Sequence, residues 1–148
     1  MKKERQSNEP IGKMIKVLSE ALGRSANKEF KALNLTMQQG AVLGYLKSRN
    51  DQENVTQKDV QNYLRVSHPT VVSVLKAMEQ KGFIVTAGSD SDKRMKLVRM
   101  TSKAECSMHQ IIEGRERMEA KLLLGFTEAE EKTLRDYLKR LYENIREE

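Results

Sequence analysis

The apolar positions of the chain recur mostly with a helical period. Between Pro10 and Leu33 they follow one another at steps of three and four residues, which is typical of one long amphipathic helix. Pro10 suits the first turn of such a helix, because its missing N–H needs no partner there. We therefore expect a helix over about 10–33. Its apolar stripe is Ile11, Met14, Ile15, Leu18, Leu22, Ala26, Phe30 and Leu33.

Polar residues mark the starts of the next three helices. Thr36 and Gln39 have the spacing of a capping box, which predicts a second helix. Thr56 can cap a short third helix, and Ser67 can cap a fourth that holds Pro69 in its first turn. The side chains expected to face inward are Val42, Leu43 and Leu46 in the second helix, Val60, Tyr63 and Leu64 in the third, and Val71, Val74, Leu75 and Met78 in the fourth.

The hydrophobic period changes after the fourth helix. Lys81 and Gly82 end that helix, because glycine readily adopts the left-handed conformation found at helix C-termini. Alternating residues predict one strand over 83–86 and a second over 95–100. The stretch between them, 87–94, is polar and rich in turn residues. The sequence therefore predicts a two-stranded hairpin with a charged tip.

Two long helices complete the chain. Thr101 is expected to cap the first and Gly125 to interrupt it, while Thr127 and Glu130 form a second capping box that opens the last helix. Two helices joined by a tight turn and followed by a hairpin are a winged helix-turn-helix. The predicted fold class is mainly α, with about six helices and a two-stranded wing. The apolar residues are Met108, Ile111, Ile112, Met118 and Leu122 on one face of the fifth helix, and Leu134, Leu138, Leu141 and Ile145 at steps of four, three and four in the sixth.

Length and composition narrow the class of protein. The 148 residues suffice for one domain with its own core, and the single cysteine, Cys106, can form no internal disulfide. The apolar runs are too short to span a bilayer, and the first residues lack the apolar region of a signal peptide. We therefore expect a soluble, cytoplasmic protein with no membrane partner.

Positive charge is unevenly distributed along the chain. The formal net charge is +6, and by segment it is +6 over 1–50, +2 over 51–100 and −2 over 101–148. Within 65–99, seven basic residues stand against three acidic ones. A basic domain binds acidic partners such as nucleic acid, an anionic membrane or an acidic protein. The C-terminal third is therefore not expected to face a polyanion.

Small, polar and cationic residues occupy the face that the fourth helix leaves exposed. Hydroxyl and imidazole groups can reach base edges in a major groove, small side chains let the backbone approach, and the Thr70 methyl or Val72 can touch a thymine methyl. An ordinary solvated helix face is the alternative. The residues concerned are Ser67, His68, Pro69, Thr70, Val72, Ser73 and Lys76.

The tip of the hairpin combines two cations with two aspartates. Asp90 and Asp92 cancel the charge of Lys93 and Arg94, so a simple cationic patch does not explain the pattern. An aspartate two residues before an arginine can orient the guanidinium by a charge-assisted hydrogen bond, and an oriented arginine on a thin loop can enter a narrow minor groove. A solvated turn is the alternative.

Several segments, in this order and spacing, resemble the MarR family of bacterial transcriptional regulators. The most specific piece is Asp92, Lys93 and Arg94, followed a few residues later by a strand that ends in Thr101. Ala104 departs slightly from the family, which often has glycine there. The resemblance covers nearly the whole chain and rests on residues 35–39, 55–60, 66–72, 78–84, 91–94 and 100–101.

The resemblance implies a homodimer that binds a pseudo-palindromic operator. We expect a repressor, which a small apolar or aromatic effector could release. The resemblance divides a single domain, 1–148, into a DNA-binding lobe over about 36–100 and dimerisation helices over about 10–33 and 102–146. The implied DNA contacts are Ser67, His68, Pro69, Thr70, Ser73 and Lys76 on the recognition helix, Lys93 and Arg94 on the wing with Asp92 holding Arg94, and Gln57 and Ser89 on phosphates.

The apolar stripes of the first and sixth helices agree with a dimer. Neither helix has an obvious partner in its own chain for its whole face, and pairing across a two-fold axis would bury both. Packing within one chain is the alternative. The expected dimerisation residues are Ile11, Met14, Ile15 and Leu18 with Leu134, Leu138, Leu141 and Ile145.

Other candidate sites are weaker. Cys106 and His109 could share a helix face, but two histidines and one cysteine are few for a metal site, and Cys106 is expected to be at least half-buried. No phosphate loop or catalytic arrangement stands out, so we expect neither an enzyme nor a cofactor. A regulator switched by the Cys106 thiol and a helical protein-interaction module that does not bind DNA are the alternative functions. Four methionines could line an effector pocket or belong to the core, namely Met14, Met37, Met108 and Met118.

Overall fold

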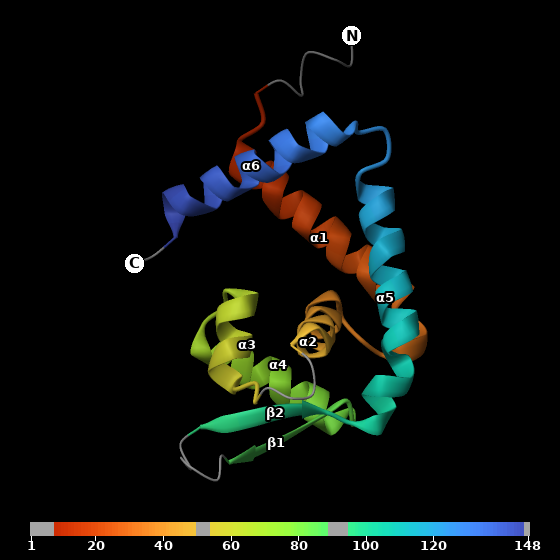
Figure 1. Ribbon diagram of the computed structural model, residues 1–148. Coiled ribbons are helices and arrows are strands. Elements are labelled where there is room, and N and C mark those ends of the chain that lie inside the picture. The colour runs from red at the N-terminus through yellow and green to blue at the C-terminus, as the bar shows by residue number, and fades with distance from the viewer. Residues whose placement is uncertain (1–7, 50–53, 89–94, 147–148) are drawn as a thin grey trace. The chain divides into compact units, whose positions relative to one another are not determined.

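The computed structural model describes residues 8–49, 54–88 and 95–146, and it is mainly helical (Figure 1). It forms two compact units, Met1–Gly114 and Arg115–Glu148, which divide within the fifth helix. The elements are α1 (Ile11–Glu29), η1 (Lys31–Leu33), α2 (Met37–Ser48), α3 (Gln57–Leu64), α4 (His68–Gln80), β1 (Ile84–Gly88), β2 (Lys96–Met100), α5 (Ser102–Leu122) and α6 (Glu128–Ile145). The predicted helical class with a two-stranded wing is confirmed. No described helix is long and apolar enough to cross a membrane.

The first helix is shorter than its apolar pattern predicts. The α-helix ends at Glu29, and one 3-10 turn, η1, follows it, so the expected single helix over 10–33 is wrong at its C-terminal end. Asn34 then adopts a left-handed conformation with φ +56°, which asparagine tolerates better than most residues. Phe30 is buried, and its ring lies against α5 at Gly114. Burial of this ring fixes the point where the chain turns towards α2.

Capping boxes begin α2 and α3. The Thr36 hydroxyl accepts a hydrogen bond from the Gln39 backbone N–H at 3.2 Å, and Gln39 Oε1 accepts one from the Thr36 N–H at 3.1 Å. Thr56 and Asp59 form the same reciprocal pair at 3.1 and 3.0 Å. Because each box satisfies two backbone N–H groups that no helical carbonyl reaches, both predicted helix starts are confirmed.

The core of the first unit lies between α2, α3, α4 and the hairpin. Tyr63 is an exception to the expected pattern: it is exposed and stacks on Tyr45 with ring centroids 4.3 Å apart. Its predicted inward position is therefore wrong, and Val74 and Leu64 are only half-buried. The core includes Val42, Leu43, Val60, Val71, Leu75, Met78, Phe83, Ile84 and Val98.

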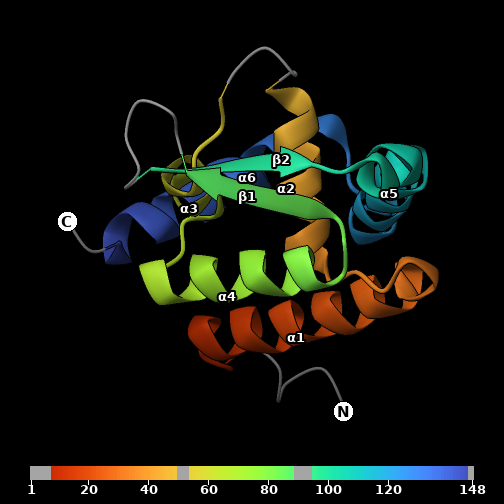
Figure 2. The ribbon, with the colours of Figure 1, turned by 90° about the horizontal axis from the view of Figure 1, so that it is seen from below.

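The hairpin is antiparallel and lies alongside α4, as Figure 2 shows. Its register pairs Ile84 with Met100 and Thr86 with Val98. The Val98 N–H points away from β1 and donates to the Val55 carbonyl oxygen at 2.8 Å. The segment before α3 therefore covers the second edge of β2 and joins the base of the wing to the helix-turn-helix.

The helix α5 is buried along a narrower stripe than expected. Met108 and Ile111 are buried, whereas Ile112 and Leu122 are exposed, so the predicted apolar face is not buried as a whole. Neighbouring residues on an α-helix are turned by about 100° from each other, so Ile111 and Ile112 do not share one narrow face. The Thr101 hydroxyl accepts from the Ala104 N–H at 3.3 Å, in agreement with the predicted cap.

The second unit contains the C-terminal end of α5 and the whole of α6. Thr127 and Glu130 form the predicted capping box, with hydrogen bonds of 2.9 and 3.1 Å. The Thr127 backbone N–H, and then its side chain, hold the pKa of Glu130 below its ordinary value. Hydrogen bonds from Arg135 to Glu131 and Glu119 raise the pKa of Arg135, which therefore stays charged.

Candidate nucleic-acid interface

The helix α4 begins with a polar cap. The Ser67 hydroxyl accepts a hydrogen bond from the Thr70 backbone N–H at 3.4 Å and lies 2.9 Å from the Thr70 hydroxyl. Pro69 occupies the first turn, where its ring fits without loss of a helical hydrogen bond. These local features place the N-terminus of α4 at the surface, with His68 beside it.

One side of α4 belongs to the core and the other is open to solvent. Val71, Leu75 and Met78 are buried, in keeping with their predicted stripe. Among the described residues, Ser73 and Lys76 make no side-chain hydrogen bond or ion pair, so their polar groups are free to meet a ligand. The predicted positions are all exposed, namely Ser67, His68, Pro69, Thr70, Val72, Ser73 and Lys76.

A hollow of about 960 Å³ opens beside the N-terminus of α4. It brings together two of the predicted contact residues, Gln57 on α3 and His68 on α4. Two lysines also line it, Lys58 on α3 and Lys96 on β2. The lining is completed by Asn54, Thr56, Asp59, Gln61, Val72 and Met95.

The first turn of α3 lines this hollow with Gln57, Lys58 and Asp59. A helix N-terminus favours anions, because its first N–H groups lack helical partners and its dipole is positive there. Asp59 occupies part of this site through its capping hydrogen bond with Thr56. Gln57 and Lys58 remain exposed or half-buried at the same turn. The arrangement suits a phosphate approached from the side of Gln57.

Lys58 and Lys96 were not among the predicted contacts. Lys58 directly follows Gln57 and lies two residues after the Thr56 cap. The signal in the sequence that could have indicated Lys58 was therefore a cation in the first turn of the third helix. Lys96 contributes to the positive charge of 65–99, but its place beside α3 depends on the pairing of β2 with Thr56. That pairing joins segments far apart in the chain, so the sequence pattern did not show it.

The wing is described only at its base. Four predicted contacts, Ser89, Asp92, Lys93 and Arg94, lie outside the described residues. At the base, Arg99 donates to Asn54 Oδ1 at 3.5 Å, a long hydrogen bond between β2 and the segment before α3. The base of the wing and the hollow beside α4 therefore belong to one surface.

Two weaker candidates are placed differently from expectation. Cys106 is exposed, so its predicted burial is wrong. His109 is exposed and pairs with Glu113 at 2.9 Å, and the described residues contain no group of three or more side chains that could hold a metal ion. Met14 and Met37 are exposed as well, so they do not belong to an inner face.

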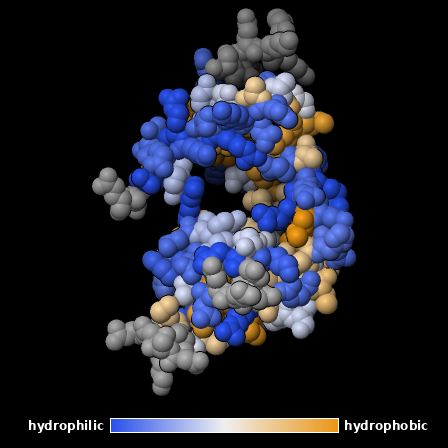
Figure 3. Space-filling view, viewed as in Figure 1, coloured by the Kyte–Doolittle hydropathy of each residue, from blue (hydrophilic) through white to orange (hydrophobic). Residues whose placement is uncertain are grey.

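Each of the two units also carries an exposed apolar surface. On α1, the predicted stripe is 45–58% exposed at Ile11, Met14, Ile15 and Leu18. On α6, Ile145 is 80% exposed, Leu138 and Leu141 are exposed, and Leu134 is half-buried. Apolar atoms also reach the surface near the turn between α5 and α6 (Figure 3), where Leu124 and Phe126 are exposed.

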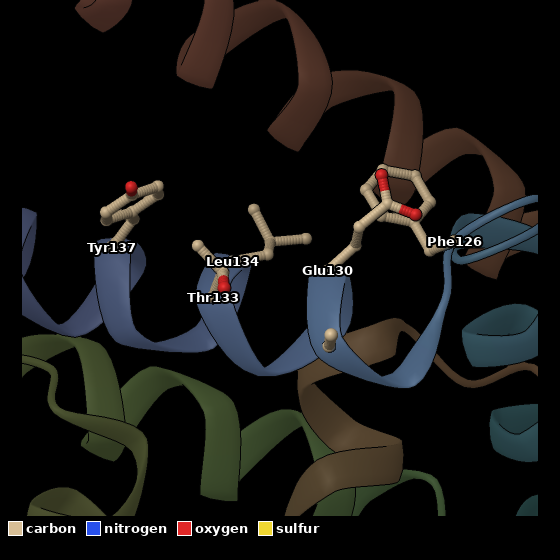
Figure 4. Close-up of a pocket in the computed structure, with 6 residues that line it drawn as sticks. Phe126, Glu130, Thr133, Leu134 and Tyr137 are labelled. Carbon is tan, nitrogen blue, oxygen red and sulfur yellow. The ribbon is translucent and has the colours of Figure 1, made fainter.

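The start of α6 carries an open apolar groove of about 370 Å³. Figure 4 shows Phe126, Glu130, Leu134 and Tyr137 projecting to the same side. Ala129 and Thr133 complete the lining. An exposed apolar groove continuous with an exposed apolar stripe is typical of a surface that another molecule covers.

The helix pair α3–α4, the exposed polar face of α4 and the adjoining hairpin define a winged helix-turn-helix protein with a DNA-binding fold. A sequence model of the MarR family matches residues 33–95. The HTH-type transcriptional regulator YwoH of Bacillus subtilis is 31% identical over 121 residues, which cover 82% of this chain and 85% of that protein. The chain belongs to the MarR family of transcriptional regulators.

Solved structures agree with this assignment. A SlyA-like transcription regulator from Listeria monocytogenes is 32% identical, with a TM-score of 0.74 over 93% of this chain and 89% of that one. The DNA complex of S. aureus MepR, at 22% identity, shares the fold with a TM-score of 0.85 over 93% of this chain and 100% of that one. These relatives are transcriptional regulators and not enzymes, in agreement with the sequence prediction.

Proposed function

We propose that the protein is a repressor that binds a pseudo-palindromic operator as a homodimer. The main support for this proposal is the solvent-facing side of α4, where Ser73 and Lys76 have no partners among the described residues. Hydroxyl groups and one cation on a helix that projects from its core can meet base edges and a phosphate in the major groove. The protein would then act at the chromosome, in the cytoplasm of a bacterial cell.

The other predicted contacts surround this helix. Gln57 at the first turn of α3 would bind a backbone phosphate, and Lys58 and Lys96 would add positive charge along the same hollow. Arg94, oriented by Asp92 and flanked by Lys93 and Ser89, would reach the minor groove from the wing. The major-groove contacts would come from Ser67, His68, Pro69, Thr70, Ser73 and Lys76.

The exposed apolar stripes support the dimer. Residues such as Leu138 and Ile145 on α6 and Ile11 on α1 are costly to leave in water, at about 25 cal/mol for each Å² of apolar surface. A second copy related by a two-fold axis would cover both stripes with identical surfaces. Two winged lobes would then face two half-sites about one helical turn apart. We also propose that a small apolar or aromatic effector releases the dimer from DNA.

Selection of duplexes from random DNA tests the proposal. The purified protein should retain sequences with two inverted half-sites. K76A and R94A should bind the selected operator about tenfold or more weakly, and the salt dependence of K76A should fall by about one charge. K132A, which removes an exposed lysine from α6, is the control and should bind as the wild-type chain does. Retention of no specific sequence, or wild-type binding by both variants, would exclude the proposed function.

A thiol-responsive regulator is the second candidate, because Cys106 is exposed to oxidants. In that case peroxide would change operator affinity, and C106S would abolish the response. An unchanged affinity after peroxide treatment, or an identical response by C106S, would exclude the switch. The other alternative, a helical protein-interaction module that does not bind DNA, disagrees with the family assignment.

A further inference from the structure

The C-terminal end of α4 is tied to the connection between α1 and α2. Lys81 Nζ donates one hydrogen bond to the Asn34 carbonyl oxygen at 2.8 Å and a second to Gln39 Oε1 at 2.9 Å. Gln39 is buried, and the same Oε1 also accepts from the Thr36 N–H. The ammonium group of Lys81 thus joins the last turn of α4 to the turn and capping box that precede α2.

The start of α5 holds the same turn from another direction. Lys103 Nζ donates to the Lys81 carbonyl oxygen at 2.7 Å, and the Thr101 hydroxyl donates to the Gly82 carbonyl oxygen at 2.6 Å. The Thr101 N–H donates to the Phe83 carbonyl oxygen at 3.1 Å. The segment 81–83 is therefore bound both by the connection that follows α1 and by the beginning of α5.

Two backbone hydrogen bonds define the geometry of the turn itself. Gly82 has φ +82°, its N–H donates to the Glu79 carbonyl oxygen, and the Phe83 N–H donates to the Met78 carbonyl oxygen, each at 3.0 Å. This pair of hydrogen bonds is a Schellman motif, which fixes the exit of a helix. A shift in the position of Lys81 therefore changes the direction of the α4 axis.

A small change in the direction of α4 has a large effect at its other end. The 13 residues of α4 span about 20 Å, so a tilt of about 3° at Lys81 moves the N-terminal turn by about 1 Å. Displacement by this amount is enough to lengthen a good hydrogen bond beyond its useful range. The predicted base contacts, Ser67 and His68 first among them, lie at that far end.

We propose that Lys81 is a positioning residue for DNA recognition. It sets the direction of α4 relative to α1 and α5, and thereby the separation between the two recognition helices of a dimer. The half-site spacing that the protein accepts then depends on Lys81, although Lys81 itself contacts no base. This inference rests on the proposed function, since it concerns how the same surface is presented to the operator.

Removal of the Lys81 ammonium group leaves the other hydrogen bonds of the fold in place. Gln39 Oε1 keeps the Thr36 N–H, and the contact at Asn34 is exposed, so water can replace the lysine there. The buried face of α4 does not include Lys81. A variant without the ammonium group should therefore fold and dimerise, while α4 loses its link to Asn34 and Gln39.

K81M is the test variant, with K47M and Q39E as controls. K47M removes the same charge and a surface ion pair between α2 and α5, with Lys47 Nζ 3.0 Å from Glu105, but it leaves the end of α4 unchanged. Q39E keeps an acceptor oxygen for Lys81 and for the capping box.

Thermal unfolding and sedimentation report the fold and the dimer. Fluorescence anisotropy on the selected operator, and selection from pools in which the spacing between fixed half-sites varies, report recognition.

K81M should remain a folded dimer, bind the operator roughly tenfold more weakly, as after loss of one base contact, and select a broader or shifted range of spacings. Its preferred half-site sequence should not change, because the face of α4 is intact. K47M and Q39E should match the wild-type chain. Wild-type spacing and affinity in K81M, a loss that K47M shares, or an unfolded or monomeric K81M would each overturn the inference. Absence of specific binding by the wild-type chain would instead remove the proposed function, and this inference with it.

Discussion

The ring of Phe30 occupies the space where a side chain on Gly114 would begin: a Cβ built on Gly114 would lie 2.6 Å from Phe30 Cε1. The G114A substitution should therefore destabilise the fold by about 1–3 kcal/mol, the usual cost of overpacking, despite the better helix propensity of alanine. G23A in α1 is the matched control, since its Cβ meets nothing within 4 Å. It should stabilise by about 0.5–1 kcal/mol. Urea unfolding of both variants checks the pair, and an unchanged midpoint in G114A would contradict the contact.

Ser73 should contribute to the choice of sequence. Its hydroxyl is exposed and without a partner among the described residues, so S73A removes a donor and acceptor from the solvent-facing side of α4 without disturbing the core. We expect the variant to lose about 1–3 kcal/mol of discrimination at one base position in each half-site. Competition between the operator and singly substituted duplexes measures this. Equal discrimination by S73A and the wild-type chain would show that the hydroxyl reads no base.

Leu138 should be central to the dimer. A lysine at this exposed position of α6 would place a charge in an apolar interface, so L138K should sediment as a monomer and bind the operator at least tenfold more weakly. D136K places the same side chain on another face of α6, where an aspartate is already exposed. D136K should remain dimeric. A dimeric L138K would assign the stripe on α6 to another partner.

Acid should weaken the start of α6. Because the hydrogen bonds of Thr127 lower the pKa of Glu130 in the folded chain, the Glu130 carboxylate stabilises that chain at pH values above its unfolded pKa. This contribution decreases below that value and is lost as the pH falls through the folded pKa. E130Q keeps an oxygen acceptor but has no proton to gain. The stability difference between the wild-type chain and E130Q should therefore shrink between pH 6 and pH 3, within the range where carboxylates titrate. A difference independent of pH would contradict this role.

Local signals account for the parts of the fold that the sequence predicted. Thr36 with Gln39 and Thr127 with Glu130 are capping pairs three residues apart, and both form as expected because each needs only its own helix. Tyr63 depends instead on tertiary contact: its partner Tyr45 belongs to another helix, and their stacking holds it at the surface. No glycine marks the left-handed residue Arg65, so the pattern did not indicate its φ of +56°.

The candidate site likewise has parts that the sequence pattern predicted and parts that it did not. The exposed face of α4, with Ser73 and Lys76, follows from helical periodicity once the apolar stripe is known. The hollow lined by Lys58 and Lys96 does not, because β2 must first pair with the segment before α3. The Lys81 junction was equally out of reach of periodicity, since it joins residues 47 and 42 positions apart in the chain.

The hairpin has one outer edge, on β1, and a helix residue partly covers it. Thr86 and Val98 face each other across the hairpin with their N–H groups directed outwards, so the Thr86 N–H would be open to another chain. Glu79 on α4 accepts from that N–H at 3.2 Å and from the Thr86 hydroxyl at 3.1 Å. An open strand edge invites addition of a further strand and hence aggregation. Glu79 thus places a negative charge at the wing's exposed edge, and a charge at such an edge opposes pairing with the strands of neighbouring copies.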